Sequence, residues 1–443
     1  MLLLPAVLFL AGITVLQAAA PTAVEPHVLP LARKTTEEEE EWRSKAIKKL
    51  WDERKHMGHT PLVKFQPKGF PNVDIFLKNE TATKTQTLKH RFAWALLSWA
   101  IIEGKVNSKS TVYDSTSGNT GASEAYMCTL VGLPFVAVVA KDIEDTKLKH
   151  ITGNGGKIMK VDVSLRNFHA KDQAEKKNGF FINQFGNAQE AEEFHESGGD
   201  PHESTNMFHE VLLQLKEDKN QKKKVPDYFV HSSGTGGTLT SVGRYIKRYN
   251  LPTTVALSDS EYSLFYDYVI SNKFTNESGT KYWKLPGIAG IGYGYNVKPV
   301  IYKETTSLNP NVIDEAMKMP DLASVAAMYV LKERGIGGGP STGLNFLVSL
   351  HKAYQLRKSK DIDGRLTIVT VICDPGEYYE STYFNSTWVD KMFEDKGGML
   401  SLKCWKGVIN KSIDRGTDFL EEGFVSCSPE TPRHRRWIRR SFP

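Results

Sequence analysis

Cysteine is scarce in this chain of 443 residues, which contains four and no Cys-x-x-Cys pair. Without such a pair or a Cys/His cluster at ligand spacing, the sequence predicts no metal site. A basic stripe with interleaved aromatics is also missing, although the net charge is +6, so nucleic acid is not an expected partner. Beyond the first twenty residues, no apolar run is long enough to cross a bilayer.

The N-terminus has a composition of its own. Leu2–Leu16 is almost entirely apolar, and Gln17–Ala20 supplies small residues for cleavage. This pattern predicts a signal peptide over residues 1–20, and hence a secreted or secretory-lumen protein without a membrane contact once the signal is removed. The alternative is an uncleaved membrane anchor. Residues 21–56 are expected to form a lead and one helix, which opens at a Thr36-x-x-Glu39 capping box.

Secretion would allow disulfide formation between cysteines and glycosylation of asparagines. In an oxidising compartment Cys404 and Cys427 are the expected disulfide, whereas Cys128 and Cys373 lie in apolar runs and should pack as small hydrophobic residues. Glycosylation sequons occur at four asparagines. We expect glycans at Asn276, Asn385 and Asn410. At Asn79 a glycan would block folding, because that residue adjoins the turn described next.

The turn before Lys89 leads directly into an apolar segment. Phe92, Leu96 and Ala100 recur at helical spacing, so Lys89 is predicted in the first turn of a packed helix. The helix dipole and burial both disfavour an ammonium there, which makes Lys89 a candidate amine nucleophile. Taken alone, it could equally be a surface lysine that extends its amine into water.

Strand-like and helix-like segments alternate from Thr111 onward. Phe135–Ala140 and Leu366–Cys373 are typical buried strands, and Val312–Arg334 is expected to be mostly helical. Repeated βα units predict an α/β fold of mostly parallel sheets flanked by helices. This pattern covers residues 57–385, with a small lobe at about 90–190 and the remainder in a large lobe. It degrades beyond that point, so 386–443 is expected to be an appended C-terminal tail.

Two polar turns each lie between a predicted strand and a predicted helix. Ser115–Gly121 (Ser-Thr-Ser-Gly-Asn-Thr-Gly) offers hydroxyls and backbone N–H groups at a helix N-terminus, which suits a carboxylate. Gly234–Thr238 (Gly-Thr-Gly-Gly-Thr) allows close approach of the backbone and can hold a phosphate. It is neither a Walker A loop nor a Gly-x-Gly-x-x-Gly fingerprint.

A third polar turn, Gly337–Gly343, also opens a helix and presents Ser341, a neutral hydroxyl that can face a heterocycle. Taken alone, that serine is equally explained as a helix cap. A buried amine, a carboxylate cradle, a phosphate cradle and a neutral hydroxyl together match pyridoxal 5'-phosphate and its amino-acid substrate.

With these motifs in order, the chain resembles the cysteine synthase/cystathionine β-synthase family of fold-type II pyridoxal-phosphate enzymes. The matching segments, all between Met57 and Thr382, are Gly58–Val63, Lys89–Arg91, Thr116–Gly121, Gln184–Asn187, Gly234–Thr238, Gly290–Gly294, Pro340–Gly343 and Gly376–Thr382. The resemblance implies a two-lobed, tryptophan synthase β-like fold with the cofactor in the cleft between the lobes, and a homodimer.

The resemblance also implies roles for single residues. Lys89 would bind the cofactor covalently and be the catalytic residue, Asn119 would bind the ring hydroxyl, and Ser341 would face the pyridine nitrogen. The phosphate would be held by Gly234, Thr235, Gly236, Gly237 and Thr238. The substrate carboxylate would be held by Ser115, Thr116, Ser117, Thr120 and Gln184. The run Thr83–Thr87 before the lysine departs from the usual family pattern and leaves the substrate open.

The expected reaction is β-replacement or β-elimination on serine, cysteine or an O-acylserine, with a thiol or sulfide as the second partner. One alternative is a serine/threonine dehydratase or racemase of the same fold. Another is a non-catalytic protein that binds sulfur amino acids or signals through a partner, which the altered Thr83–Thr87 run would permit.

Overall fold

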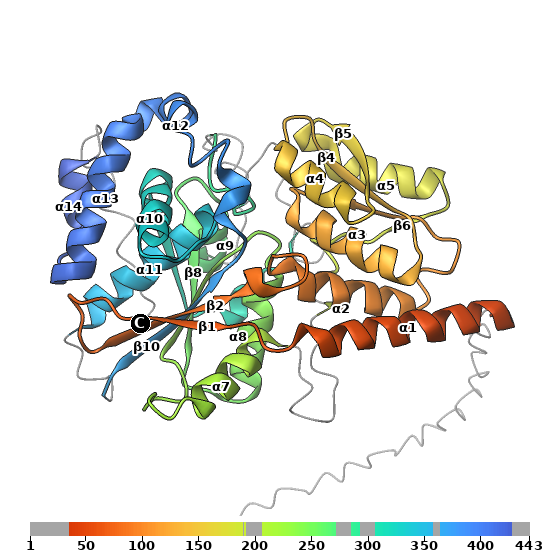
Figure 1. Ribbon diagram of the computed structural model, residues 1–443, viewed down its shortest axis with the longest axis horizontal. Coiled ribbons are helices and arrows are strands. Elements are labelled where there is room, and N and C mark those ends of the chain that lie inside the picture. The colour runs from red at the N-terminus through yellow and green to blue at the C-terminus, as the bar shows by residue number, and fades with distance from the viewer. Residues whose placement is uncertain are drawn as a thin grey trace, which may run out of the picture.

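The computed structural model describes residues 35–188, 190–191, 206–271, 285–292, 306–357 and 364–427. Two parallel sheets organise this part of the chain into two lobes (Figure 1). This confirms the predicted α/β class. The expected signal peptide and the sequon at Asn276 lie outside the described residues.

The larger sheet has the strand order β1-β2-β10-β7-β8-β9. Only β1 runs antiparallel to its neighbour. Every residue of β10 is buried, as expected for a parallel strand covered on both faces. The bounds are β1 Leu62–Phe65, β2 Val73–Asn79, β10 Leu366–Ile372, β7 Tyr228–Ser232, β8 Thr254–Ser260 and β9 Glu315–Met319.

Alternation along the strands divides the large-lobe core into two layers. Ile75 and Ile368 pack on one face and Phe76 and Val369 on the other, because successive side chains point to opposite faces. Helices α10 and α11 cover the first face, and α7 and α8 the second. The helices of this lobe are α7 Met207–Glu217, α8 Gly237–Arg248, α9 Phe265–Ser271, α10 Asp321–Glu333 and α11 Pro340–Leu356.

The smaller sheet has the order β5-β4-β3-β6 and is parallel throughout. Its elements are β3 Val112–Ser115, β4 Phe135–Ala140, β5 Lys157–Val161, β6 Phe180–Phe181, α2 Lys89–Ile102, α3 Asn119–Val131, α4 Asp145–Gly153 and α5 Arg166–Lys176. The N-terminal helix α1, Glu37–Met57, also belongs here, since Ala46 and Leu50 enter the same core and Trp94 Nε1 donates to the Leu50 carbonyl at 2.6 Å.

Two sequence expectations need correction. The stretch 312–334 is helical over most of its length, but its first part contains edge strand β9, and α10 begins only after Pro320, where a helix running in from β9 would lose a backbone hydrogen bond. Residues beyond 385 do not form a mere appended tail as far as the structure describes them. They form α12 Ser386–Met392, α13 Gly398–Arg415 and α14 Phe419–Ser426.

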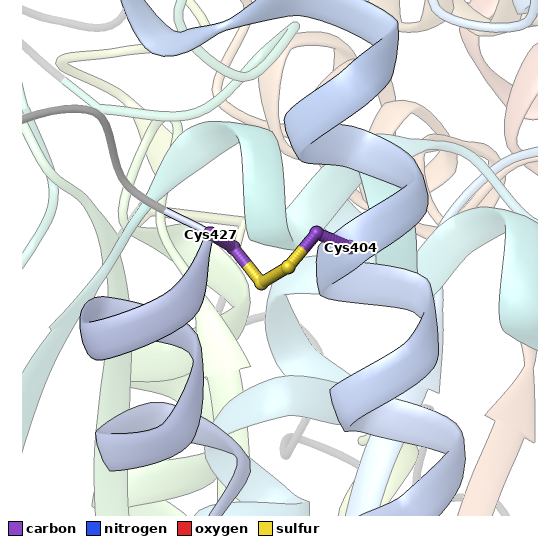
Figure 2. The surroundings of a disulfide bond; sticks show 2 residues. All are labelled: Cys404 and Cys427. Atoms are coloured by element: carbon purple, nitrogen blue, oxygen red, sulfur yellow. A yellow bond between two sulfur atoms is a disulfide. The ribbon is translucent and has the colours of Figure 1, made fainter.

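These C-terminal helices lie against the large lobe (Figure 1). Trp405, Ile409 and Phe419 are buried in its hydrophobic core, and α13 packs on α10. A disulfide joins Cys404 of α13 to Cys427, which follows α14 (Figure 2). The sequence prediction missed this helical layer because it relied on alternating strands and helices, and no strand lies between these three helices.

Candidate active site

The carboxyl ends of three adjacent parallel strands converge on one edge of the large sheet. Strand β2 leads through η1, Glu80–Ala82, to Lys89, while β10 ends before Cys373 and β7 leads into the loop at Gly234. In open α/β sheets ligands bind at this edge. The sheet order therefore brings together segments that are far apart in the sequence.

Lys89 is the first residue of α2, as the sequence predicted. The backbone N–H of Leu88 donates to the Cys373 carbonyl at 2.9 Å, which fixes the turn to the end of β10. Burial lowers the pKa of Lys89 to about 8, and the nearby Cys373, Glu124 and Asp114 oppose that shift. A lysine with this pKa supplies a neutral, nucleophilic amine near neutral pH.

The loop after β7 opens helix α8. Gly236 has a φ of +93°, and a Cβ on it would lie 2.1 Å from the Leu308 backbone nitrogen. On Gly234 a Cβ would lie 2.3 Å from the Gly290 carbonyl. Both glycines are therefore required by close backbone packing. The first N–H groups of α8 have no carbonyl within the helix to bind, and they form a ready anion site at Gly234, Thr235, Gly236, Gly237 and Thr238.

Ser341 is buried in the first turn of α11. Its hydroxyl is a hydrogen-bond neighbour of the Cys373 thiol, whose pKa is raised to about 12, first by burial and then by Asp374. The Gly339 N–H donates to the Asp374 carbonyl at 3.1 Å, so the start of α11 is held against the end of β10. Cys373 thus links this neutral hydroxyl to the lysine turn, because its thiol neighbours Ser341 and its carbonyl accepts from the Leu88 N–H.

Asn119 begins α3 and reaches across from the small lobe. Its Nδ2 donates to Asp374 Oδ2 at 2.7 Å, and the Tyr379 hydroxyl donates to the same oxygen at 2.5 Å. Asp374 was not among the residues predicted from the sequence. Its place directly after an apolar strand, next to the Gly376–Thr382 motif, was the only available signal.

The predicted substrate loop is held mainly by its own hydrogen bonds. Thr116 Oγ1 accepts from the backbone N–H groups of Gly118 at 3.1 Å and Gly121 at 3.0 Å. Ser115 is buried and Ser117 is exposed. A Cβ on Gly121 would lie 2.5 Å from the Thr116 methyl group, so the glycine permits this tight loop.

The side-chain amide of Gln184 holds this loop in place through hydrogen bonds. Its Nε2 donates to Asp114 Oδ2 at 2.8 Å and to the Ser115 carbonyl at 2.7 Å, and its Oε1 accepts from the Thr120 hydroxyl at 2.7 Å. Both amide hydrogens are therefore engaged within the protein. In this arrangement Gln184 orients Thr120 and has no donor left for a substrate carboxylate.

A buried carboxyl pair lies beneath this loop and escaped the sequence reasoning. Burial raises the pKa of Asp114 to about 7 and places that of Glu124 well above its usual value, where the neighbouring Asp114 raises it further. Glu124 comes one helical turn after Thr120, within electrostatic range of Lys89. Burial and the neighbouring carboxyl therefore favour the neutral form of Glu124, whereas the hydrogen bonds from Gln184 favour the charged form of Asp114. Two acidic residues ten positions apart gave no sequence signal.

His231, in β7, was also missed. Burial, and to a lesser degree the charge of Lys89, lower its pKa to about 3, which favours the neutral ring. Asn345 Nδ2 lies 3.3 Å from His231 Nδ1.

No group of acidic, cysteine or histidine side chains in the described ranges could hold a metal ion. None of the helices within those ranges is long and apolar enough to cross a membrane.

The remaining predicted sites lie at the periphery. Asn385 caps α12 and is exposed, whereas Asn410 lies within α13 and its Oδ1 accepts from Arg334 at 2.7 Å. Cys128 and Cys373 are free and buried.

Several buried polar atoms of these loops have no protein hydrogen-bond partner: Asn119 Oδ1, Ser232 Oγ, Ser233 Oγ and Asp374 Oδ1. Because buried polar groups are normally paired, the loops are suited to a polar ligand. A cavity lined among others by Leu88, Phe92, Met207, Gly237 and Thr238 borders only the phosphate loop and the turn before Lys89, and none of these four atoms lines it. The donor set fits pyridoxal phosphate: an amine at Lys89, an anion site at α8, an amide at Asn119 and a hydroxyl at Ser341.

Comparison with known proteins agrees with this site. Residues 53–374 match the family described as pyridoxal-phosphate dependent enzyme. The chain belongs to this family, within its cysteine synthase/cystathionine β-synthase branch, and its cofactor is pyridoxal phosphate.

Two relatives are similar along most of their length. A pyridoxal-phosphate dependent protein of Caenorhabditis elegans is 64% identical over 391 residues, covering 88% of this chain and 90% of the relative. The L-cysteine desulfhydrase Cds1 of Mycobacterium tuberculosis is 31% identical over 364 residues, covering 81% and 92%. Among solved structures, an O-ureido-L-serine synthase has a TM-score of 0.60 at 24% identity, with 74% and 93% covered, and shows the same fold.

Proposed function

We propose that this enzyme catalyses β-elimination or β-replacement on a small amino acid, namely cysteine, serine or an O-acylserine, with sulfide or a thiol as product or second substrate. L-Cysteine is the favoured substrate. The relative that supports this choice is named L-cysteine desulfhydrase and is similar over 81% of the chain. In elimination, cysteine and water would give sulfide, ammonia and pyruvate.

The observation that carries the proposal is the neutral hydroxyl of Ser341 at the start of α11, beside Cys373, whose carbonyl holds the turn before Lys89. When bound, pyridoxal phosphate stabilises negative charge at the α-carbon of an amino acid. A hydroxyl cannot hold the pyridine nitrogen protonated as a carboxylate would, so Ser341 limits how long that charge persists. This favours prompt loss of a β-substituent over transamination.

The protein's own groups would move the proton. Lys89 Nζ, with a pKa of about 8, would take the proton from the substrate α-carbon. It would return that proton to the α-carbon in replacement, and it would give it to the departing sulfur in elimination. The backbone N–H groups at the start of α3 would hold the substrate carboxylate, since Thr116 and Gln184 already fix the loop that carries them.

The test is product analysis with purified, cofactor-loaded protein. Sulfide and pyruvate should form from L-cysteine, and a new thioether or cysteine should form when a thiol or sulfide is supplied with serine or O-acetylserine. Lys89→Ala should abolish turnover and leave the fold intact. The matched control is Lys84→Ala, because Lys84 is exposed and lies on the same turn. This variant should change neither the turnover nor the fold.

Other products would point elsewhere. Keto acid together with the pyridoxamine form of the cofactor would contradict the assignment of Ser341. Pyruvate from serine without sulfide from cysteine would indicate a dehydratase, and D-serine would indicate a racemase. A spectral response to amino acids without any product would indicate a non-catalytic binding protein.

We also propose that the chain enters the secretory pathway and forms a homodimer. The first twenty residues and the Cys404–Cys427 disulfide support the location, because disulfides persist in oxidising compartments. Peptide mapping of natively expressed protein should show a new N-terminus near Pro21, and light scattering should give twice the chain mass. A retained Met1 on cytosolic protein would overturn the first claim, and a monomer the second.

A further inference from the structure

Asp374 is the one carboxyl group that contacts a residue assigned to the cofactor ring among the described residues. Its Oδ2 accepts two hydrogen bonds, from Asn119 Nδ2 at 2.7 Å and from the Tyr379 hydroxyl at 2.5 Å. The side chain is buried, with 2% of the residue exposed. The contact crosses between the lobes, since Asn119 opens α3 and Asp374 follows β10.

The surrounding backbone is shaped to accept this carboxyl group. A Cβ on Gly339 would lie 2.2 Å from Asp374 Oδ1 and 2.5 Å from the Tyr379 ring. Only glycine therefore fits beside Asp374 without a shift. Gly339 caps α11, so Asp374 also lies at the positive end of a long helix, where a negative charge is stabilised.

A primary amide has two N–H groups, and Asn119 uses one of them on Asp374. Its orientation is thereby fixed, because a flipped amide would set its oxygen against the carboxylate. Asn119 Oδ1 has no protein partner. The second N–H of Asn119 remains available for an acceptor such as the ring hydroxyl oxygen of the cofactor.

We infer that Asp374 is a positioning residue that orients Asn119 toward the ring oxygen of the cofactor and adds a negative charge behind that contact. A nearby negative charge favours the protonated form of a cationic group. Asp374 should therefore raise the pH at which the lysine-linked cofactor loses its proton. This inference rests on cofactor binding at Lys89 and is independent of which amino acid is the substrate.

The other charged groups near Asp374 come from α4. Lys147 Nζ pairs with Glu144 at 3.1 Å and lies 4.8 Å from the centre of the Tyr379 ring. Burial and, more weakly, Glu144 raise the pKa of Asp374, while Tyr379, Asn119 and Lys147 act in the opposite direction. These donors favour the ionised carboxylate that the inference requires.

The experiment is a pH titration of the visible absorbance of the cofactor bound to Lys89, without substrate. Asp374→Asn keeps the shape of the side chain and removes the charge. Its absorbance midpoint should fall by about one pH unit, the order of shift that the loss of one nearby charge produces. An unchanged midpoint in a folded, cofactor-loaded variant would overturn the inference. Exposed Glu377→Gln, three residues along the chain, is the matched control and should leave the midpoint in place.

A double-mutant cycle separates an effect through Asn119 from a direct one. Asn119→Ala should lower the midpoint and speed release of the cofactor, measured by its fluorescence after dilution. If Asp374 acts through Asn119, adding Asp374→Asn to Asn119→Ala should change the release rate little further. Additive effects on release would overturn the positioning role. Because no substrate is used, either outcome leaves the proposed reaction to its own test.

Discussion

The hydroxyl of Tyr378 lies 3.0 Å from Nδ1 of His150. His150 belongs to α4 of the small lobe, whereas Tyr378 belongs to η5, Gly376–Tyr379, beside the large sheet. The same hydroxyl donates to Gln86 Oε1 at 3.2 Å, in the turn that leads to Lys89. One phenol thus connects the small lobe to the lysine turn.

This bridge should respond to acid. Burial lowers the pKa of His150, so its neutral form contributes stability above the usual histidine pKa of about 6.5, and that stability is lost as pH falls through the lower folded-state value. His150→Asn should therefore lose less stability than the parent between pH 7 and pH 5. Urea unfolding at both pH values measures this, with exposed His59→Asn as the control. Equal losses in parent and variant would contradict it.

Cofactor capture should depend on the ionisation of Lys89. With a pKa of about 8, the fraction of neutral amine, and so the rate at which cofactor-free protein binds pyridoxal phosphate, should rise about tenfold from pH 7 to pH 9. Stopped-flow absorbance measures the rate, and borohydride followed by peptide mapping locates the label. A label on any lysine other than Lys89 would refute the assignment.

Because of the carboxyl pair Asp114 and Glu124, we expect the free energy of unfolding to decline as the pH rises. The folded-state pKa of Glu124 is raised, so its contribution is complete below the unfolded value of about 4.5 and is lost as pH rises toward the folded value, by up to about 1.4 kcal/mol per pH unit for one proton. Glu124→Gln should therefore gain stability relative to the parent at pH 8 compared with pH 5. A difference between the two proteins that is the same at both pH values would show that Glu124 is already ionised.

The phosphate loop should not tolerate a side chain at Gly236. Gly236→Ala adds the cost of a left-handed conformation, about 1–2 kcal/mol, to a clash with the Leu308 backbone, and it should weaken cofactor binding more than tenfold. Gly132→Ala, at the C-cap of α3, has a φ of +82° and no atom within 4 Å of the added Cβ. This control should lose only the conformational part and keep its affinity. Calorimetry and cofactor titration give both quantities.

Removal of the disulfide should loosen the C-terminal layer. The bond spans 23 residues, and closing such a loop is worth about 3 kcal/mol in the chain-entropy model. Cys404→Ser with Cys427→Ser should lower the melting temperature and increase proteolysis between α13 and α14. Reductant should destabilise the parent in the same way and leave the double variant unchanged. An effect of reductant on the double variant would mean that another bond is involved.

The local sequence determined those parts of the protein that depend on neighbouring residues. Lys89 could be placed in the first turn of a helix from the apolar spacing after it, and the Gly234–Thr238 loop could be identified because its glycines and its strand-to-helix position are adjacent in the chain. Alternating strands and helices also fixed the α/β class. The local pattern did not reveal strand β9, because a five-residue edge strand beside a long helix leaves little periodicity to detect.

Tertiary structure decided which side chains from distant segments contact one another within the site. Asn119 meets Asp374 across 255 positions only because the ends of β3 and β10 face each other between the lobes. Gln184 orients Thr120, with both its amide hydrogens engaged, because β6 lies beside β3. Burial beside Asp114 raises the pKa of Glu124, a property of packing that residue type does not reveal. Hydrogen-bond partners and desolvation depend on distances in space, which the order of residues alone does not specify.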